Sequence, residues 1–296
     1  MRGAGVVAGV VAGVASGLLL AAAPAAVPAA AQPAAVAPAS RPLPPKVEHA
    51  EPLYIDLIRD LGARRGEAEW NVGLGLTDRL AFDEYTVLVE YEWAVRDRLG
   101  LEIELPATIY SAPRREGATA SGPTPASRLE SLKTAVQWTT HVSERRQTSF
   151  ALGYINELRV TDPRGWNGRR AVAGNGYNPF FVAAKRWTHH AHTLVYAGAT
   201  LDQTFGRGFG APAYEINSSA HYLLPGTRNF VGLEVNQVVA GRRLDTVLRP
   251  QMRLAVAGNL LLGVVVGVPV HRREERLSTF FRVIYEPRQH RGAVGH

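Results

Sequence analysis

The sequence contains no cysteine, and this absence limits the chemistry open to the protein. A chain without thiols forms no disulfide, no thiolate metal site and no lipid-modified cysteine. Lysine is scarce as well: of the 33 lysines and arginines, three are lysines, Lys46, Lys133 and Lys185. The others are arginines, whose planar guanidinium groups suit phosphate-bearing partners, and the formal net charge is +7.

Long apolar runs are missing beyond residue 40, so the roughly 18 consecutive apolar residues of a membrane-spanning helix are not found there. Residues 1–31 do contain such a run, with Arg2 at its start and the small residues Ala29–Ala31 at its end. This pattern predicts a signal peptide that is cleaved on export, and an uncleaved membrane anchor is the alternative. Residues 32–46 are rich in proline and alanine and predict an extended linker.

One helical pattern is present, in residues 47–66. Leu53, Leu57, Ile58 and Leu61 recur at helical spacing, and a glycine follows directly. The spacing predicts a short amphipathic helix that packs against the body of the protein. A role as a plug or docking element is the alternative.

From Glu69 onward the pattern changes to an alternation of apolar and polar residues, which is typical of β-strands. Many of these segments exceed the usual length of about five or six residues and reach the roughly nine to eleven that a tilted strand needs to cross a bilayer. About twelve strands are expected in residues 67–287, before a C-terminal tail at 288–296. The expected ranges are 68–77, 83–95, 97–109, 128–141, 147–160, 178–188, 191–204, 212–223, 228–239, 245–257, 259–269 and 277–286.

The connections between these strands alternate in length. Short turns follow the second, fourth, sixth, eighth and tenth strands, whereas long connections such as residues 110–127 and 161–177 follow others. Outer-membrane barrels have short turns at one end and longer loops at the other. The sequence therefore predicts an all-β fold, a transmembrane antiparallel barrel of about twelve strands with a short N-terminal amphipathic helix. A soluble sandwich, whose apolar faces would meet each other, is the alternative.

Charged residues share one face of several strands, opposite an apolar face. In a membrane barrel the apolar face meets lipid and the polar face lines the lumen. A lumen filled by salt bridges and a narrow polar pore are both compatible with the mixed signs of charge. The candidate lumen residues are Glu90, Glu92, Glu102, Glu104, Glu234, Arg249, Arg253 and Arg282.

Arginines gather in the connections at the expected outer end. Contact with the phosphates of lipopolysaccharide is the main interpretation, and a mouth that attracts anionic solutes is the alternative. No nucleic-acid partner is expected. These residues are Arg114, Arg115, Arg164, Arg169, Arg170, Arg207, Arg242, Arg243, Arg272, Arg273 and Arg276.

Two further motifs are candidates for a metal site and for a catalytic site. The stretch HHAH, His189–His192, lies in a predicted turn without a nearby carboxylate, so no metal or cofactor is expected. His141 and Ser143, with Asn156 on the next strand, are similar to the His, Ser and Asn set of outer-membrane phospholipase A. The residues after Ser143 are ERRQ and depart from the Asn-Gly-Arg-Ser continuation of that enzyme, so no enzymatic activity is expected.

Two stretches resemble a known group of proteins. Residues 49–78, which begin HAEPLYIDLIRDLGAR, and residues 248–287 are similar to exported Gram-negative proteins that are predicted outer-membrane barrels. The C-terminal stretch is also similar, more loosely, to transporters of the phenol-degradation meta-pathway group. The resemblance implies an outer-membrane location and a barrel architecture, and it brings no catalytic residue.

Together these patterns predict an exported outer-membrane barrel that acts as a channel or small-solute transporter. One alternative is a non-transporting barrel with a structural or adhesive role, its lumen blocked by charges and by the N-terminal element. The other is a lipid-hydrolysing outer-membrane enzyme. The expected partners are outer-membrane lipid, lipopolysaccharide and a small solute.

Overall fold

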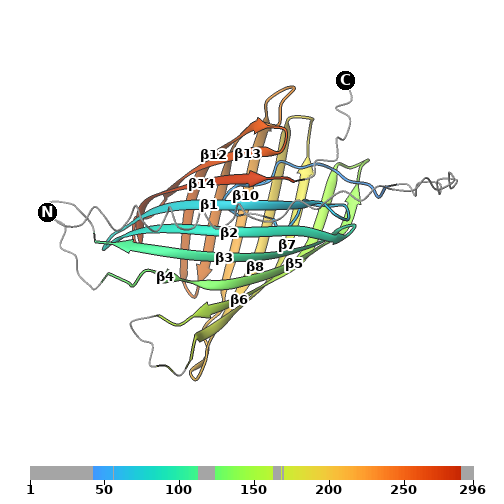
Figure 1. Ribbon diagram of the computed structural model, residues 1–296. Helices are drawn as coiled ribbons and strands as arrows, with labels where there is room; N and C mark the ends of the chain where they lie inside the picture. Colours follow the sequence, from blue (N-terminus) through green and yellow to red (C-terminus); the bar gives the residue numbers. More distant parts are fainter. Residues whose placement is uncertain (1–42, 56, 113–123, 163–167, 169, 288–296) are drawn as a thin grey trace, which may run out of the picture. The chain divides into compact units, whose positions relative to one another are not determined.

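The structure is a computed structural model that describes residues 43–55, 57–112, 124–162, 168 and 170–287. Twelve strands of 10 to 15 residues dominate this part of the chain (Figure 1). Two more strands, β4 (Arg128–Leu129) and β9 (Gly208–Phe209), have two residues each. The long strands are β1 (Ala68–Arg79), β2 (Asp83–Arg96), β3 (Leu99–Ser111), β5 (Ser131–Ser143), β6 (Thr148–Val160), β7 (Val172–Arg186), β8 (Ala191–Thr204), β10 (Ala213–Leu223), β11 (Phe230–Ala240), β12 (Arg243–Ala257), β13 (Leu260–Pro269) and β14 (Glu275–Tyr285).

The long strands close into a barrel by antiparallel pairing. β1 pairs with β2 on one side and with β14 on the other, and β8 pairs with β10, so the ladder returns to its start. Among the twelve long strands of the described residues, closure leaves no open edge. A membrane-spanning sheet requires this because lipid offers its backbone no hydrogen-bond partners. The predicted antiparallel barrel of twelve strands is confirmed.

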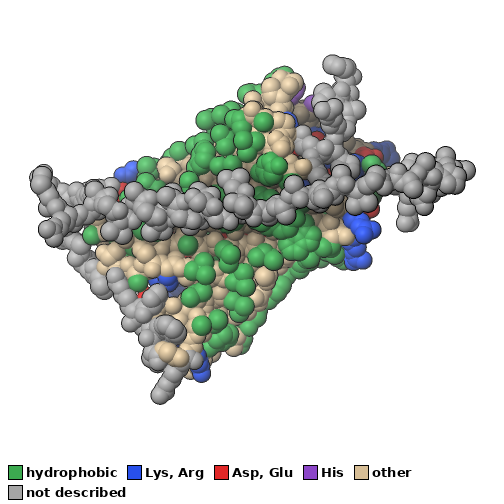
Figure 2. Space-filling model, in the orientation of Figure 1, with side chains coloured by type: hydrophobic (Ala, Val, Ile, Leu, Met, Phe, Trp, Pro, Cys, Tyr) green, Lys and Arg blue, Asp and Glu red, His purple; other side chains and the backbone are tan. Residues whose placement is uncertain are grey.

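Side chains alternate between the outer wall and the lumen along each strand. On β1, Leu74 and Leu76 are exposed on the outer wall, whereas Asn71 is fully buried on the inner face. Figure 2 shows hydrophobic side chains over the middle of the visible wall and basic side chains mainly toward its ends. Apolar side chains outside and polar ones inside are the pattern of an outer-membrane barrel.

The two ends of the barrel differ in the length of their connections. Turns of two to six residues join β2 to β3, β5 to β6, β7 to β8, β10 to β11 and β12 to β13, and we call this the short-turn end. The opposite end, which we call the long-loop end, carries the connections from β3 to β5, from β6 to β7 and from β8 to β10. The predicted alternation of connection lengths is therefore observed.

One strand starts earlier than the sequence indicates. The expected range 178–188 becomes β7, Val172–Arg186. Its glycines resemble those of a loop, yet Gly174 belongs to the wall, because a Cβ there would lie 2.1 Å from a carbonyl oxygen of β8. Two adjacent aromatic residues of β7 face opposite ways: Phe180 faces the lumen and is 7% exposed, whereas Phe181 faces outward and is 39% exposed.

The predicted amphipathic helix is wrong. Residues 47–66, of which all but Asp56 are described, contain no helix and follow an irregular path through the lumen. Pro52 contributes, because it has no N–H and disfavours helical backbone in the residue before it. Wall side chains also accept hydrogen bonds from the N–H groups of Leu53 and Ile55, which a helix would direct to its own carbonyls. We call residues 43–67 the lumenal segment, and its place inside the barrel agrees with the alternative role as a plug.

The expected signal peptide (residues 1–31), most of the expected linker (32–46) and the C-terminal tail (288–296) lie outside the described residues. Within the described ranges, no helix is long and apolar enough to cross a membrane.

Candidate functional site in the barrel lumen

Apolar contacts hold the lumenal segment against two separate regions of the inner wall. Leu57, Ile58 and Leu61 pack against β5 to β8, whereas Ala50 and Leu53 pack against β11, β13 and β14. All five residues are 2% exposed. Burying a side chain of leucine size contributes roughly 1.5–3 kcal/mol, so the segment is an integral part of the folded barrel.

Polar side chains of the wall bind the backbone of the segment. Such bonds replace the hydrogen bonds that an irregular chain lacks, and losing one leaves a buried donor unpaired at a cost of about 1–3 kcal/mol. In each bond a backbone N–H of the segment donates to a wall side chain: Ala50 to His192 Nδ1 (2.8 Å), Leu53 to Gln251 Oε1 (2.7 Å), Ile55 to Glu234 Oε1 (3.1 Å) and Gly62 to Thr139 Oγ1 (3.0 Å).

The segment enters and leaves the lumen at the short-turn end. Lys46 Nζ donates to Asp60 at 2.9 Å and to Glu67 at 3.1 Å, which ties the start of the segment to its end. Burial opposes the charge of Lys46, but the two carboxylates outweigh this effect and raise the pKa of the lysine. Arg98, in the turn between β2 and β3, donates its backbone N–H to the carbonyl of Ala63 at 2.6 Å.

Glutamates of β1, β2 and β3 lie side by side on the inner wall. Glu90 is directly opposite Glu104 in the β2–β3 ladder, and Glu92 is opposite Glu102. All four and Glu69 of β1 are at most 8% exposed. Carboxylates opposite one another repel, so this face needs cations or hydrogen-bond donors close by.

The donors come from three directions. The amide of Asn71 donates to Glu69, Glu90 and Glu92 at 2.8 to 3.0 Å. The guanidinium of Arg59, in the lumenal segment, lies 3.3 Å from Glu69 and 3.8 Å from Glu92. The segment is thus bound to the acidic wall by charge as well as by packing. On the far side, Lys133 of β5 pairs with Glu104 at 2.8 Å.

The predicted basic lumen residues also face inward. Arg249 donates to Asn236 at 2.6 Å and to Ser278 at 3.0 Å, and its guanidinium lies 3.4 Å from the centre of the Tyr54 ring. Arg282 lies 3.9 Å from Glu90. Arg253 stacks on Phe230, 4.6 Å from the ring centre. Arg249 therefore contacts both the segment and the wall, and the three arginines form no ring of one charge sign.

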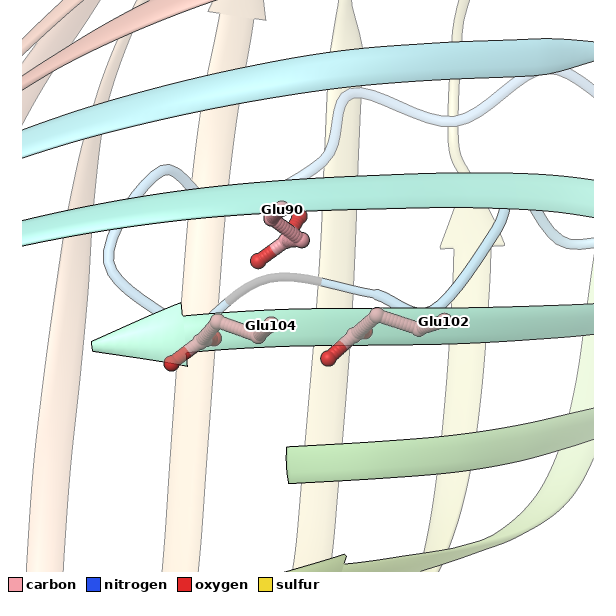
Figure 3. A group of neighbouring side chains, drawn as sticks. All are labelled: Glu90, Glu102 and Glu104. Carbon is pink, nitrogen blue, oxygen red and sulfur yellow. The ribbon is translucent and has the colours of Figure 1, made fainter. Parts of the chain in front are cut away.

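A cavity of about 450 Å³ remains between the lumenal segment and the long-loop end, and we call it the vestibule. Tyr54, Ile55 and Ile58 of the segment line one side of it, and Arg79 and Glu275 line it where their strands reach the long-loop end. Figure 3 shows three of its other residues, Glu90, Glu102 and Glu104. One carboxylate oxygen from each lies within 4.8 Å of the other two. The volume is suited to a small organic molecule.

Gly100 of β3 is small because the segment lies against it, and Gly100→Ala is expected to destabilise the protein. A Cβ at this position would lie 2.7 Å from Cβ of Arg59, closer than two carbon atoms can pack. Overpacking of this kind costs about 1–3 kcal/mol. The measurement is the free energy of unfolding in urea, followed by the gel mobility of unheated samples.

Gly75→Ala is the matched control, since Gly75 also faces the lumen but a Cβ there would lie 3.4 Å or more from its neighbours. Without a clash, alanine in a strand is expected to be neutral or stabilising by up to about 1 kcal/mol. Equal effects of the two substitutions would show that the segment does not pack on Gly100.

The basic loop residues can be placed only in part. Arg242, Arg272 and Arg273 are exposed at the long-loop end, and Arg243 pairs there with Asp245 and Glu274. Arg170 and Arg207 are exposed too, and Arg276 lies 4.0 Å from Asp78. Arg114, Arg115, Arg164 and Arg169 lie outside the described residues.

The structure does not bring the candidate hydrolase residues together. Pairing places His141 opposite Phe150 and Asn156 opposite Thr134. His141 and Asn156 are therefore separated by six residues along the ladder, or about 20 Å. Of the HHAH stretch, His192 is buried and accepts the N–H of Ala50, whereas His189 is exposed in the turn.

Sequence reasoning missed several residues that bind the segment. Arg59 and His192 were not predicted to lie in the lumen, and neither was Asn71. The signal for Asn71 was present, because it is two residues from Glu69 and so shares its face. No comparable signal exists for Arg59, because its position depends on the irregular path of the segment.

The closed ladder, the apolar outer wall and the polar lumen define the class of the protein, which has the fold of an outer-membrane β-barrel. The chain belongs to the HAEPLYID-like family, whose model matches residues 45–286. Comparison with curated protein sequences gives no match.

Solved structures share the fold at low sequence identity. An outer membrane channel from Pseudomonas putida F1 aligns with a TM-score of 0.56 and 12% identity, covering 76% of this chain and 97% of that one. The KdgM porin aligns with a TM-score of 0.50 and 12% identity, covering 73% of this chain and 98% of the porin. At these identities the likeness establishes a common architecture.

Proposed function

We propose that the protein is an outer-membrane channel for small solutes, in which the lumenal segment controls passage. The observation that carries this proposal is a polar lumen of which one part, the vestibule, is open space of about 450 Å³ and the rest holds the segment. The channel folds of the similar solved structures support it. Export through a cleaved signal peptide at residues 1–31 is part of the proposal.

Passage through this barrel requires the segment to shift. Leu53 and Leu57 pack against different groups of strands on the inner wall, so the segment bridges the lumen. It is joined to the wall by hydrogen bonds, ion pairs and apolar contacts, which are reversible. We propose that a solute enters the vestibule from the long-loop end, and that displacement of the segment opens the route to the short-turn end.

We further propose that the long-loop end is the outer one and that its arginines contact lipopolysaccharide. Exposed Arg242, Arg272 and Arg273 support this orientation, because guanidinium groups bind phosphate oxygens strongly. The short-turn end then faces the periplasm, as short turns do in outer-membrane barrels.

Conductance in planar lipid bilayers tests the channel function. The protein without residues 1–31 is expected to show small or intermittent currents, and a variant that also lacks residues 47–66 should show larger and steadier ones. The reason is that deletion removes the chain that bridges the lumen.

The gel mobility of heated and unheated samples shows whether each variant has folded, since a folded barrel migrates differently from an unfolded chain. If both proteins fold and neither carries current, the channel proposal is contradicted, and the non-transporting structural barrel is favoured instead.

A further inference from the structure

The vestibule has more acidic than basic groups. Seven glutamates and four basic residues line it. The basic residues are all engaged: Arg79 with Glu84 and Glu275, Lys133 with Glu104, Arg159 with Glu157, and Arg282 with Glu90, at 2.8 to 3.9 Å. The lining therefore carries acid that its own cations do not balance.

Glu102 is the clearest case of this imbalance. It is 8% exposed, and the cation whose charge acts on it is Lys133, which is already paired with Glu104 at 2.8 Å. Its side chain lines the vestibule beside Glu90 and Glu104 (Figure 3). A buried carboxylate that shares its only nearby cation with another carboxylate is costly, and a second cation in the vestibule would offset this cost.

The spacing of the three carboxylates suits a protonated amine. An ammonium group has three N–H donors, and three oxygens bonded to it at about 2.8 Å lie about 4.6 Å apart. The oxygens of Glu90, Glu102 and Glu104 lie within 4.8 Å of one another. One ammonium nitrogen can therefore contact all three with little movement of the side chains.

The rest of the lining is partly apolar and aromatic. Phe180 and Tyr196 stack with ring centres 4.9 Å apart, and Phe280 and Ile155 also line the vestibule. Such a surface favours a ligand with a hydrocarbon or aromatic body, because polar solutes gain little from it.

We propose that the vestibule binds small organic amines, with the ammonium group held by Glu90, Glu102 and Glu104 and the apolar body placed against Phe180, Tyr196 and Phe280. This inference rests on the proposed channel function, because it names the class of solute that the channel selects. It also sets the lumen apart from the arginine-rich outer loops, whose charge would favour anions.

Three probes with the same phenyl body test the proposal. They are 2-phenylethylamine, 2-phenylethanol and 3-phenylpropanoate, titrated calorimetrically into the whole folded barrel in detergent at pH 7. The amine is expected to bind at least tenfold more tightly than the alcohol, and the carboxylate should bind most weakly. Equal affinities, or tightest binding of the carboxylate, would overturn the proposal.

Glu102→Gln keeps the shape of the side chain and removes its charge, so affinity for the amine should fall at least tenfold while affinity for the alcohol stays unchanged. Glu144→Gln, in the exposed turn between β5 and β6, is the matched control and should bind like the unmodified protein. An unchanged amine affinity in Glu102→Gln, with the barrel folded by its gel mobility, would contradict the assignment.

Calcium chloride titrated alone provides a second readout. Binding of Ca²⁺ that depends on Glu102, in a protein that does not bind the amine, would overturn the proposal in favour of a metal site. Binding and conductance separate the two hypotheses. Amine binding without current would contradict the channel alone, and current without amine binding would contradict this inference alone.

Discussion

Joining the lumenal segment to the wall by a disulfide is expected to stop the passage of solutes. The suitable pair is Leu53→Cys with Gly263→Cys. A Cβ on Gly263 would lie 3.3 Å from Cγ of Leu53, which is one bond from Cβ of Leu53. The two Cβ atoms are therefore roughly 3.3 to 4.8 Å apart, a range that contains the Cβ–Cβ separation of a disulfide. The natural chain has no cysteine, so no other thiol competes. Oxidation should lower conductance at least tenfold, and a reductant should restore it.

This prediction depends on the segment being the moving part. The same double variant under reducing conditions controls for the loss of the Leu53 side chain, and oxidised Leu53→Cys alone controls for the oxidant. Should the oxidised double variant conduct as well as the reduced one, solutes would pass beside the segment, and the proposed gating would be wrong.

The barrel could be predicted because the patterns that specify it lie within short stretches of the sequence. Alternation along β2 and β3 places Glu90, Glu92, Glu102 and Glu104 on one face, and the connection lengths distinguish the two ends. A closed ladder with an apolar outer wall satisfies both patterns at once. The expected lumen residues that are described, including Glu234 and Arg249, lie inside for the same reason.

The path of the lumenal segment could not be predicted from its own pattern. Leu53, Leu57, Ile58 and Leu61 are spaced as on one face of a helix, but they bind opposite sides of the lumen in an irregular chain. What replaces the helix is a set of wall side chains, such as Gln251, that lie up to 198 positions away in the sequence. Tertiary contacts of this kind override local propensity.

Acidification is expected to loosen the segment through His49, which lies outside the spanning strands. Burial, then the charges of His192 and Arg186, lowers the pKa of His49 from 6.5 to about 4. Its Nε2 is 2.9 Å from Ser149 Oγ on β6, so the docked segment holds a mostly neutral ring. A released segment would bind a proton more readily. The contribution of His49 to docking is therefore complete above pH 6.5 and is lost as the pH falls toward 4.

Other groups titrate in this range, so His49 must be isolated by difference. Burial and the neighbouring Asp60 raise the pKa of Glu51, which then favours docking at low pH and opposes His49. The comparison is between the natural chain and His49→Gln, whose amide can still bond Ser149, each with Ala50→Cys as a reporter. Ala50 is 2% exposed, so a maleimide labels this position only when the segment is released.

The ratio of labelling rates, natural His49 over His49→Gln, cancels the intrinsic pH dependence of the thiol reaction. It should rise roughly 50- to 100-fold between pH 7.5 and pH 4.5, as a shift from 6.5 to about 4 implies. His189→Gln, in an exposed turn, should leave the rate unchanged at both pH values. A ratio that stays constant with pH would contradict the prediction, because it would mean that His49 has the same pKa in the docked and the released segment. The buried contacts of the segment would then be looser than the hydrogen bonds at His192 and Gln251 imply.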